Sequence, residues 1–119
     1  MIIVDTSVWI DHLRNTNPEL IQLLNKALVL THPFIIGELA CGNLHKRAQF
    51  LILMKNLPIA KEATNQEVLY FIEHNQLMGR GIGYIDSHLL ASTALTAETK
   101  IWTLDKRLNN LACNLGLSL

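Results

Sequence analysis

The sequence predicts an α/β domain in which helices cover both faces of a central parallel β-sheet. Three observations support this fold class. Short apolar runs alternate with helix-like segments along the 119 residues, which is the order expected of β-α-β units. The first run, Ile2-Ile3-Val4, is apolar without alternation, as in a strand that is buried on both faces. Half of the residues are hydrophobic and 17% are charged, so we expect a single folded domain over residues 1–119.

The N-terminal half contains two predicted strands and four predicted helices. Pro18 fits the first turn of one helix, because proline lacks the N–H group that a first turn leaves unpaired. His32-Pro33 opens the next helix, and Gly42 suits the position just after its end. The predicted strands are residues 2–4 and 28–30, and the helices begin at residues 6, 18, 33 and 45 and end near residues 13, 26, 41 and 56.

The C-terminal half continues the alternation. Thr64 is a predicted N-cap, with Glu67 in the capping-box position three residues later. Glycines at 79, 81 and 83 indicate a loop, but they follow a helix, so they do not form a dinucleotide-binding fingerprint. The predicted helices span residues 64–77, 84–97 and 105–115, and the predicted strands span residues 57–60, 100–103 and, as a short edge strand, 116–119.

The two cysteines and the N-terminus bear on the compartment. Cys41 and Cys113 lie in apolar, helix-like stretches without a CxxC motif, so we expect buried reduced thiols and neither a disulfide nor a zinc site. The N-terminal segment has no positively charged leader, and no apolar run reaches membrane-spanning length. The sequence therefore predicts a cytoplasmic protein that does not contact a membrane.

Two acids directly follow predicted strands. Asp5 comes after residues 2–4, and Asp105 comes shortly after residues 100–103. Ligands of open parallel sheets bind beyond the carboxyl ends of the strands, so we expect these two carboxylates to meet there. Helix N-capping explains each of them about as well when it is considered alone.

Two further acids lie on predicted helices without a basic residue at helical spacing. Glu38 and Asp86 have mainly apolar neighbours three and four residues away, and an unpaired buried carboxylate is costly. A bound cation would remove that cost. The alternatives are a rim position at which Glu38 reaches water, and a first-turn position at which Asp86 faces the helix dipole. An all-oxygen donor set favours Mg²⁺ or Mn²⁺ over zinc.

The overall charge gives no sign of a nucleic-acid binder. Ten basic residues balance ten acidic ones, whereas such proteins usually carry a basic excess. A bound divalent cation would add positive charge at the place where a phosphate approaches. None of the five histidines pairs with a serine or cysteine in a nucleophile motif, so covalent catalysis is not expected.

The four acids lie in four segments with a familiar order. These segments are IVDTSVWIDHLR, IIGELACG, GIGYIDSHLLASTAL and IWTLDKRL. Together they resemble the PIN-domain ribonucleases, and in particular the VapC-type toxins of bacterial toxin–antitoxin pairs. The likeness covers essentially the whole chain, and each segment contributes its acid. The sequence is therefore identified as similar to this family over its full length.

The resemblance implies a three-layer α/β/α PIN-like fold and Mg²⁺- or Mn²⁺-dependent endonucleolytic cleavage of RNA, commonly tRNA or rRNA, which inhibits translation. It also implies a homodimer and a cognate VapB-like antitoxin that occludes the site, with operator DNA bound only through the antitoxin. Carried over by position, the acidic site is Asp5, Glu38, Asp86 and Asp105, and Ser7 and Thr103 are supporting hydroxyls. Some family members carry a further acid at the position of Arg107, so Asp105 is the acid expected to bind metal through water.

The expected mechanism needs no side-chain nucleophile. Asp5, Glu38 and Asp86 hold the principal Mg²⁺, and Asp105 completes the site or recruits a second ion. The metal lowers the pKa of a bound water, and the hydroxide attacks in line, leaving 5′-phosphate and 3′-hydroxyl ends. Candidate contacts to RNA phosphates, for which plain surface solvation is the alternative, are Arg80, Lys106 and Arg107.

Other interpretations stay open at this point. A haloacid-dehalogenase-like phosphatase also places an Asp after its first strand, but its chemistry requires a second Asp where Ser7 stands. A catalytically inactive PIN-like module would bind RNA or a protein without cutting. The segment 45–54, HKRAQFLILM, combines a basic start with dense apolar residues, which suits either a core helix or an antitoxin or dimer contact.

Overall fold

Three short parallel strands form the central sheet of the computed structural model, which describes all 119 residues. β1 (Ile2–Val4) lies between β2 (Val29–Leu30) and β3 (Lys100–Trp102). In register, Ile2 lies opposite Val29 on one side and Lys100 on the other. All three residues of β1 are buried, as expected of a strand that is covered on both faces.

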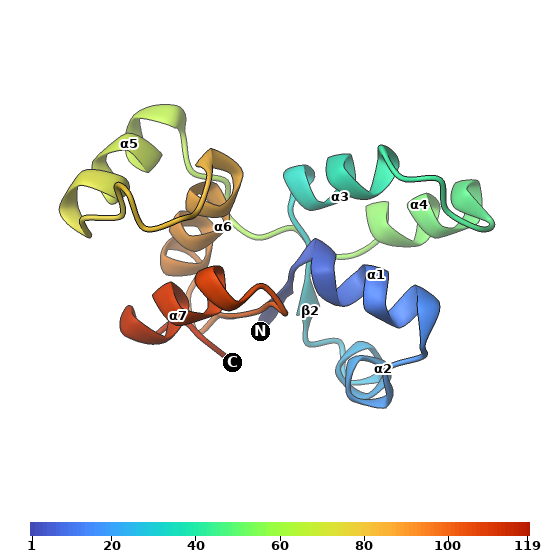
Figure 1. Cartoon of the computed structure of the whole chain (residues 1–119). Coiled ribbons are helices and arrows are strands. Elements are labelled where there is room, and N and C mark those ends of the chain that lie inside the picture. Colours follow the sequence, from blue (N-terminus) through green and yellow to red (C-terminus); the bar gives the residue numbers. More distant parts are fainter.

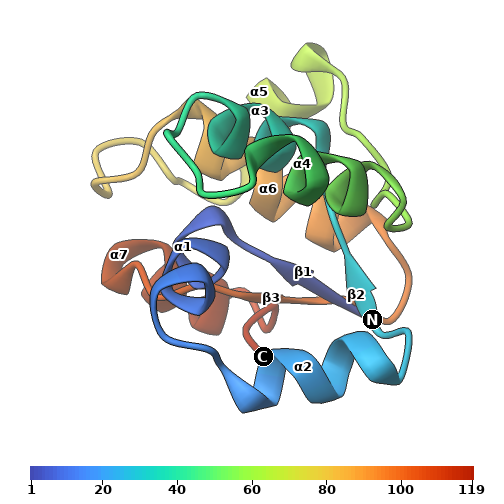
Figure 2. The same ribbon diagram turned by 90° about the vertical axis from the view of Figure 1, so that its right-hand side faces the viewer.

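Helices surround this sheet on both sides (Figures 1 and 2). In Figure 2 the strands run between α3, α4, α5 and α6 above and α2 below, and β1 leads into α1 at the end where α7 also lies. This arrangement confirms the predicted α/β class with a central parallel sheet between helical layers. The helices are α1 (Thr6–Arg14), α2 (Pro18–Asn25), α3 (Pro33–Ala40), α4 (Arg47–Lys55), α5 (Asn65–His74), α6 (Tyr84–Leu95) and α7 (Lys106–Asn114).

The two weakest predicted strands each form only one bridge to the sheet. Residues 57–60 bridge to β2 through Ile59 and Thr31, and residues 116–119 bridge to β3 through Ser118 and Ile101. The first segment makes two hydrogen bonds with Thr31: the Thr31 amide donates to the Pro58 carbonyl, and the Ala60 amide donates to the Thr31 carbonyl, each at 2.9 Å. The two segments therefore widen the sheet at both edges without forming regular strands.

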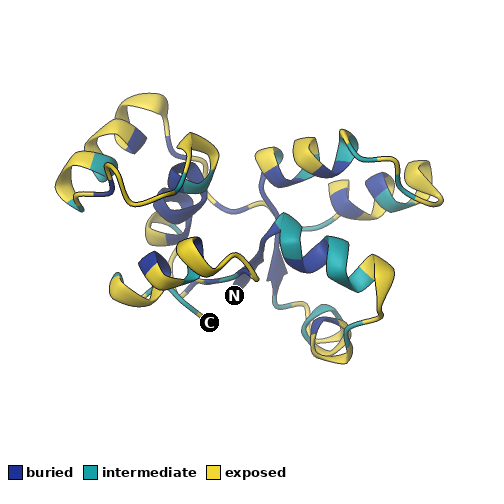
Figure 3. Ribbon diagram, in the orientation of Figure 1, coloured by how far each residue is buried: buried dark blue, intermediate teal, exposed yellow.

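The core is continuous across the sheet, and α6 is the helix most deeply set in it. One cluster of 19 buried residues includes all of β1 together with Trp9 and Leu89. Every residue from Ser87 to Thr93 is buried, whereas the outer faces of α4 and α5 are exposed (Figure 3). The middle of α6, which directly follows Asp86, is therefore anchored to the centre of the molecule.

Local signals placed most helix ends correctly. The capping box of Thr64 and Glu67 forms as predicted, with both reciprocal hydrogen bonds present. The cysteine prediction was right in one part and wrong in the other: Cys41 and Cys113 are both free, but both are exposed. Cys41 is the C-cap of α3, and Cys113 lies beside the buried stripe of α7, which explains their exposure. None of the helices has the length and apolar character needed to cross a membrane.

Candidate active site

Asp5 lies at the carboxyl end of β1 and is held by two hydroxyl groups. Thr103 Oγ1 donates a hydrogen bond to Asp5 Oδ2 at 2.7 Å, and Ser7 Oγ donates to the same oxygen at 2.9 Å. The residue is 6% exposed, and its side chain makes no capping bond to α1 although it occupies the N-cap position. Capping therefore does not account for this carboxylate, and its Oδ1 atom has no hydrogen-bond partner within the protein.

The same hydroxyls join the two strand ends that carry Asp5 and Asp105. Ser7 Oγ accepts from the Leu104 amide at 3.0 Å, and Thr103 Oγ1 accepts from the Asp105 amide at 3.1 Å. The two hydroxyl oxygens are 3.3 Å apart. These contacts couple the position of the Asp5 carboxylate to the backbone that leads into α7, so Ser7 and Thr103 have the geometry of positioning residues.

Glu38 is exposed on α3, which corrects the prediction of an apolar environment. Ile35 and Leu39 form the buried face of that helix, and Glu38 lies at the rim. Its Oε1 atom accepts a hydrogen bond from Thr6 Oγ1 at 2.7 Å. Sequence reasoning missed Thr6, because this contact joins α1 to α3 across 32 residues of sequence. The only available signal was the adjacency of Thr6 to Asp5.

Asp86 lies in the first turn of α6 and is half-buried. The pKa of its carboxyl is raised from the ordinary value of 3.8 to about 6. Burial is the largest cause, and the negative charges of Asp5, Asp105 and Glu38 add to it. A hydrogen bond from the backbone of Gly83 acts in the opposite direction. The helix dipole thus does not offset the cost of this charge. Asp5, Asp105 and Glu38 therefore lie close enough to Asp86 to act on its charge.

Asp105 serves as the N-cap of α7, as the capping interpretation predicted. Its Oδ1 atom accepts from the Leu108 amide at 3.0 Å, and the side chain is exposed. Asp105 nevertheless contributes to the raised pKa of Asp86, so it also belongs to the acidic group. Asp105 therefore caps α7 and also lies close enough to Asp86 to act on its charge.

The donor set fits a hard divalent cation. Asp5, Glu38 and Asp105 each use one carboxylate oxygen in a hydrogen bond with the protein, and the other oxygen has no protein partner. A cation among four mutually repelling carboxylates would be favoured by charge and by oxygen chemistry. No three His, Cys, Asp or Glu side chains lie in a ligating arrangement as they stand, so ion binding requires these side chains to close together.

The three candidate phosphate contacts are all exposed, and one of them is packed against the glycine loop. Gly81 has φ +84°, and a Cβ atom built there would lie 2.7 Å from Cδ of Arg107. Arg107 therefore lies directly over the loop that leads to Asp86. The structure gives no comparable contact for Arg80 or Lys106.

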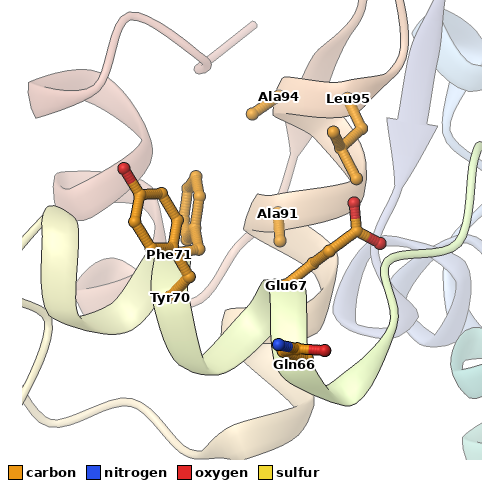
Figure 4. Close-up of a pocket in the computed structure, with 7 residues that line it drawn as sticks. All are labelled: Gln66, Glu67, Tyr70, Phe71, Ala91, Ala94 and Leu95. Atoms are coloured by element: carbon orange, nitrogen blue, oxygen red, sulfur yellow. The ribbon is translucent and has the colours of Figure 1, made fainter.

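The clearest cavity of the molecule is separate from these acids. It has a volume of about 540 Å³ and lies between α5 and α6, where Figure 4 shows the rings of Tyr70 and Phe71 facing Ala91, Ala94 and Leu95. None of the four acids lines it. The chemistry available to the acids is thus that of an open sheet edge, and not that of an enclosed pocket.

Comparisons with known proteins agree with this fold. Residues 2–113 match the model of the PIN domain, so the chain belongs to the PIN-domain family. Two relatives, each named Ribonuclease VapC32, come from Mycobacterium tuberculosis strains CDC 1551 / Oshkosh and ATCC 25618 / H37Rv. Each is 42% identical to this chain over 119 residues, which is all of this chain and 96% of the relative. Within the PIN-domain family the chain is therefore of the VapC type, which confirms the resemblance drawn from its four segments.

Proposed function

We propose that this chain is a divalent-metal-dependent endoribonuclease that acts as the toxin of a type II toxin–antitoxin pair. One observation carries the proposal: burial, together with the negative charges of Asp5, Asp105 and Glu38 from three other segments, raises the pKa of Asp86 to about 6. PIN nucleases are generally metal-dependent, and the two relatives bear the name ribonuclease. Strongly perturbed acids at such an edge are typical of functional sites.

The residues that would hold the ion are Asp5, Glu38 and Asp86, with Asp105 completing the site. Mg²⁺, or Mn²⁺ in its place, supplies an activated water and polarises a phosphate when it is bound. Ser7 and Thr103 fix the buried Asp5 carboxylate by donating to its Oδ2 atom. Because these hydroxyl protons are engaged by Asp5, neither residue is set up as a nucleophile, which agrees with hydrolysis by water.

The proposed substrate is RNA, either tRNA or rRNA, and its cleavage would inhibit translation. Arg107, held over Gly81 beside the acids, is the best placed of the basic residues to contact an RNA phosphate, with Arg80 and Lys106 nearby in sequence. The proposed protein partners are a second copy of the chain and a VapB-like antitoxin, through which alone operator DNA would be bound. Exposed Ile52 and Leu53 on α4 are candidates for one of these contacts.

The test is cleavage of purified tRNA and rRNA with Mg²⁺ and with EDTA. We expect 5′-phosphate and 3′-hydroxyl ends in Mg²⁺ and no cleavage in EDTA. Asp5→Asn and Asp86→Asn should abolish cleavage and stay folded, whereas Asp11→Asn, outside the acidic group, should cut normally. A folded Asp86→Asn protein with full activity would contradict the assignment of Asp86 to the active site. Inhibited translation with every RNA intact would favour an inactive binding module, and turnover of small phosphate esters would favour a phosphatase.

A further inference from the structure

Three aromatic side chains gather where α3 meets α6, in the turns next to those that carry Glu38 and Asp86. They are Phe34, Tyr84 and His88, and we call them the aromatic cluster. The ring centroid of His88 lies 4.7 Å from that of Phe34 and 4.7 Å from that of Tyr84. The interplanar angles are 71° and 88°, so the imidazole meets both rings edge to face. The centroids of the Phe34 and Tyr84 rings are therefore separated by at most twice 4.7 Å.

The two outer rings are open to solvent, whereas the imidazole between them is buried. Phe34 is 37% exposed and Tyr84 is 43% exposed, but His88 is only 7% exposed. The chain contains only three Phe, two Trp and two Tyr. Two of these few rings are thus kept at the surface beside the acids instead of in the core, although burial of a ring would be favourable.

Hydrogen bonds hold the cluster in place from three helices. Tyr84 Oη bonds to Oδ1 of Asn65, the first residue of α5, and lies 3.0 Å from Nε2 of His88. Nδ1 of His32, the N-cap of α3, accepts from the Phe34 amide at 3.0 Å, and its ring packs 5.2 Å from that of Phe34. The rings are therefore fixed before any ligand arrives, which lowers the entropic cost of binding.

The position of the cluster links it to the acids. Phe34 and Glu38 are four residues apart on α3, so they share one face of the helix and lie about 6 Å apart. Tyr84 lies two residues before Asp86 in the first turn of α6, so the two share a turn but not a face of the helix. A polymer whose phosphate lies at the acids would therefore bring its neighbouring residue to the aromatic cluster.

We propose that Phe34 and Tyr84 form a subsite that stacks an unpaired nucleobase of the RNA, next to the phosphate held at the acids. The inference rests on the proposed ribonuclease function. Unpaired bases are recognised by stacking on aromatic side chains, and every base offers a face for this contact. The balanced charge of the chain adds weight, because ten basic and ten acidic residues leave little net attraction for phosphates. Stacking supplies affinity that charge does not.

The test begins with binding of a short single-stranded RNA to the Asp86→Asn protein in Mg²⁺, so that the RNA stays uncut. Phe34→Leu and Tyr84→Leu keep apolar volume but remove the ring, and each should raise the Kd about tenfold. Phe34→Trp, which keeps an aromatic ring at this position, should bind the RNA with a Kd close to that of the protein with Phe34. Tyr70→Leu is the matched control: Tyr70 is 68% exposed on α5 and lies at the α5–α6 cavity, away from the acids, so its loss should leave the Kd unchanged.

A second arm identifies the base that is stacked. Oligonucleotides with a single abasic position should bind more weakly when that position is next to the cleaved bond, and this loss should disappear in the Phe34→Leu background. In the cleaving protein, Phe34→Leu should raise KM more than it lowers kcat. If the wild-type chain cuts RNA but Phe34→Leu and Tyr84→Leu bind and cut like it, the subsite is wrong and the nuclease stands. If the wild-type chain cuts no RNA, the proposed function fails, and the binding arm still decides the subsite. Loss of antitoxin binding with unchanged RNA binding would instead assign the rings to a protein partner.

Discussion

Replacement of Asp86 by asparagine should stabilise the metal-free protein at neutral pH while it abolishes cleavage. The pKa of the Asp86 carboxyl is raised in the folded state from 3.8 to about 6, first by burial and then by the charges of Asp5, Asp105 and Glu38. The folded protein therefore binds this proton more tightly than the unfolded chain does. The contribution of Asp86 to the free energy of unfolding therefore falls as the pH rises from about 4 to about 6.

The size of the effect follows from the same pKa. A rise of this size corresponds to about 3 kcal/mol if the full difference is expressed. Asp86 is only half-buried, so solvent screens part of the repulsion, and we expect a gain of about 1–2 kcal/mol for the Asp86→Asn protein at pH 7.5. Such a gain raises the melting temperature of a domain of this size by about 4 °C or more.

The assay is urea unfolding in EDTA at pH 7.5 and at pH 4. The Asp86→Asn protein should be more stable than the wild type at pH 7.5, and the difference should be much smaller at pH 4, where Asp86 is protonated in the folded state and partly protonated in the unfolded chain. Asp11→Asn is the control and should change stability by less than about 0.5 kcal/mol. Mg²⁺ should stabilise the wild type more than it stabilises Asp86→Asn. Equal stabilities at pH 7.5, or a difference that persists unchanged at pH 4, would refute the electrostatic argument.

Three further changes probe the supports of the site. Thr103→Val removes the hydroxyl that donates to Asp5 at 2.7 Å and accepts from the Asp105 amide. It should lower the free energy of unfolding by about 1–2 kcal/mol and reduce RNA cleavage. Unchanged stability and unchanged cleavage would contradict the positioning role of Thr103. Gly81→Ala should be destabilising, because alanine is strained at φ +84° and its Cβ meets the Arg107 side chain. Arg107→Ala in the same protein should relieve the clash but not the backbone strain. A double-mutant cycle without coupling would count against the contact between Gly81 and Arg107. Thr64→Ala breaks the capping box of α5 and should cost about 1 kcal/mol in thermal unfolding with RNA cleavage unchanged.

The parts of the fold that depend on local chemistry were predictable from the sequence. The apolar run of β1, the proline at the start of α2 and the capping box of α5 each determine structure within a few residues. The edge segments 57–60 and 116–119 were harder, because a bridge depends on the neighbouring strand and not on the segment alone. The exposure of Cys113 was missed for the same reason, since it depends on which stripe of α7 meets the core.

The environments of the candidate site residues were also predictable only where they depend on nearby sequence. Helical spacing shows which partners a residue has on its own helix, and on that basis Glu38 and Asp86 looked alike. The structure separates them: Glu38 is solvated and bonded to Thr6 from α1, whereas Asp86 is half-buried and repelled by three acids from other segments. Neither environment is encoded within four residues of the acid. The order of the four segments was the signal that brought these acids together.

The place of Asp86 in the fold explains how the chain can sustain this repulsion. Asp86 is the third residue of α6, in which every residue from Ser87 to Thr93 is buried, so its backbone can move away from the other acids only if the core of the domain moves. The many apolar contacts of α6 therefore offset the destabilisation that the charge of Asp86 causes. A carboxylate on a mobile loop would swing into water and lose both the repulsion and the affinity for a cation that repulsion creates. The deep burial of α6 is thus what keeps the acids close enough to favour a cation.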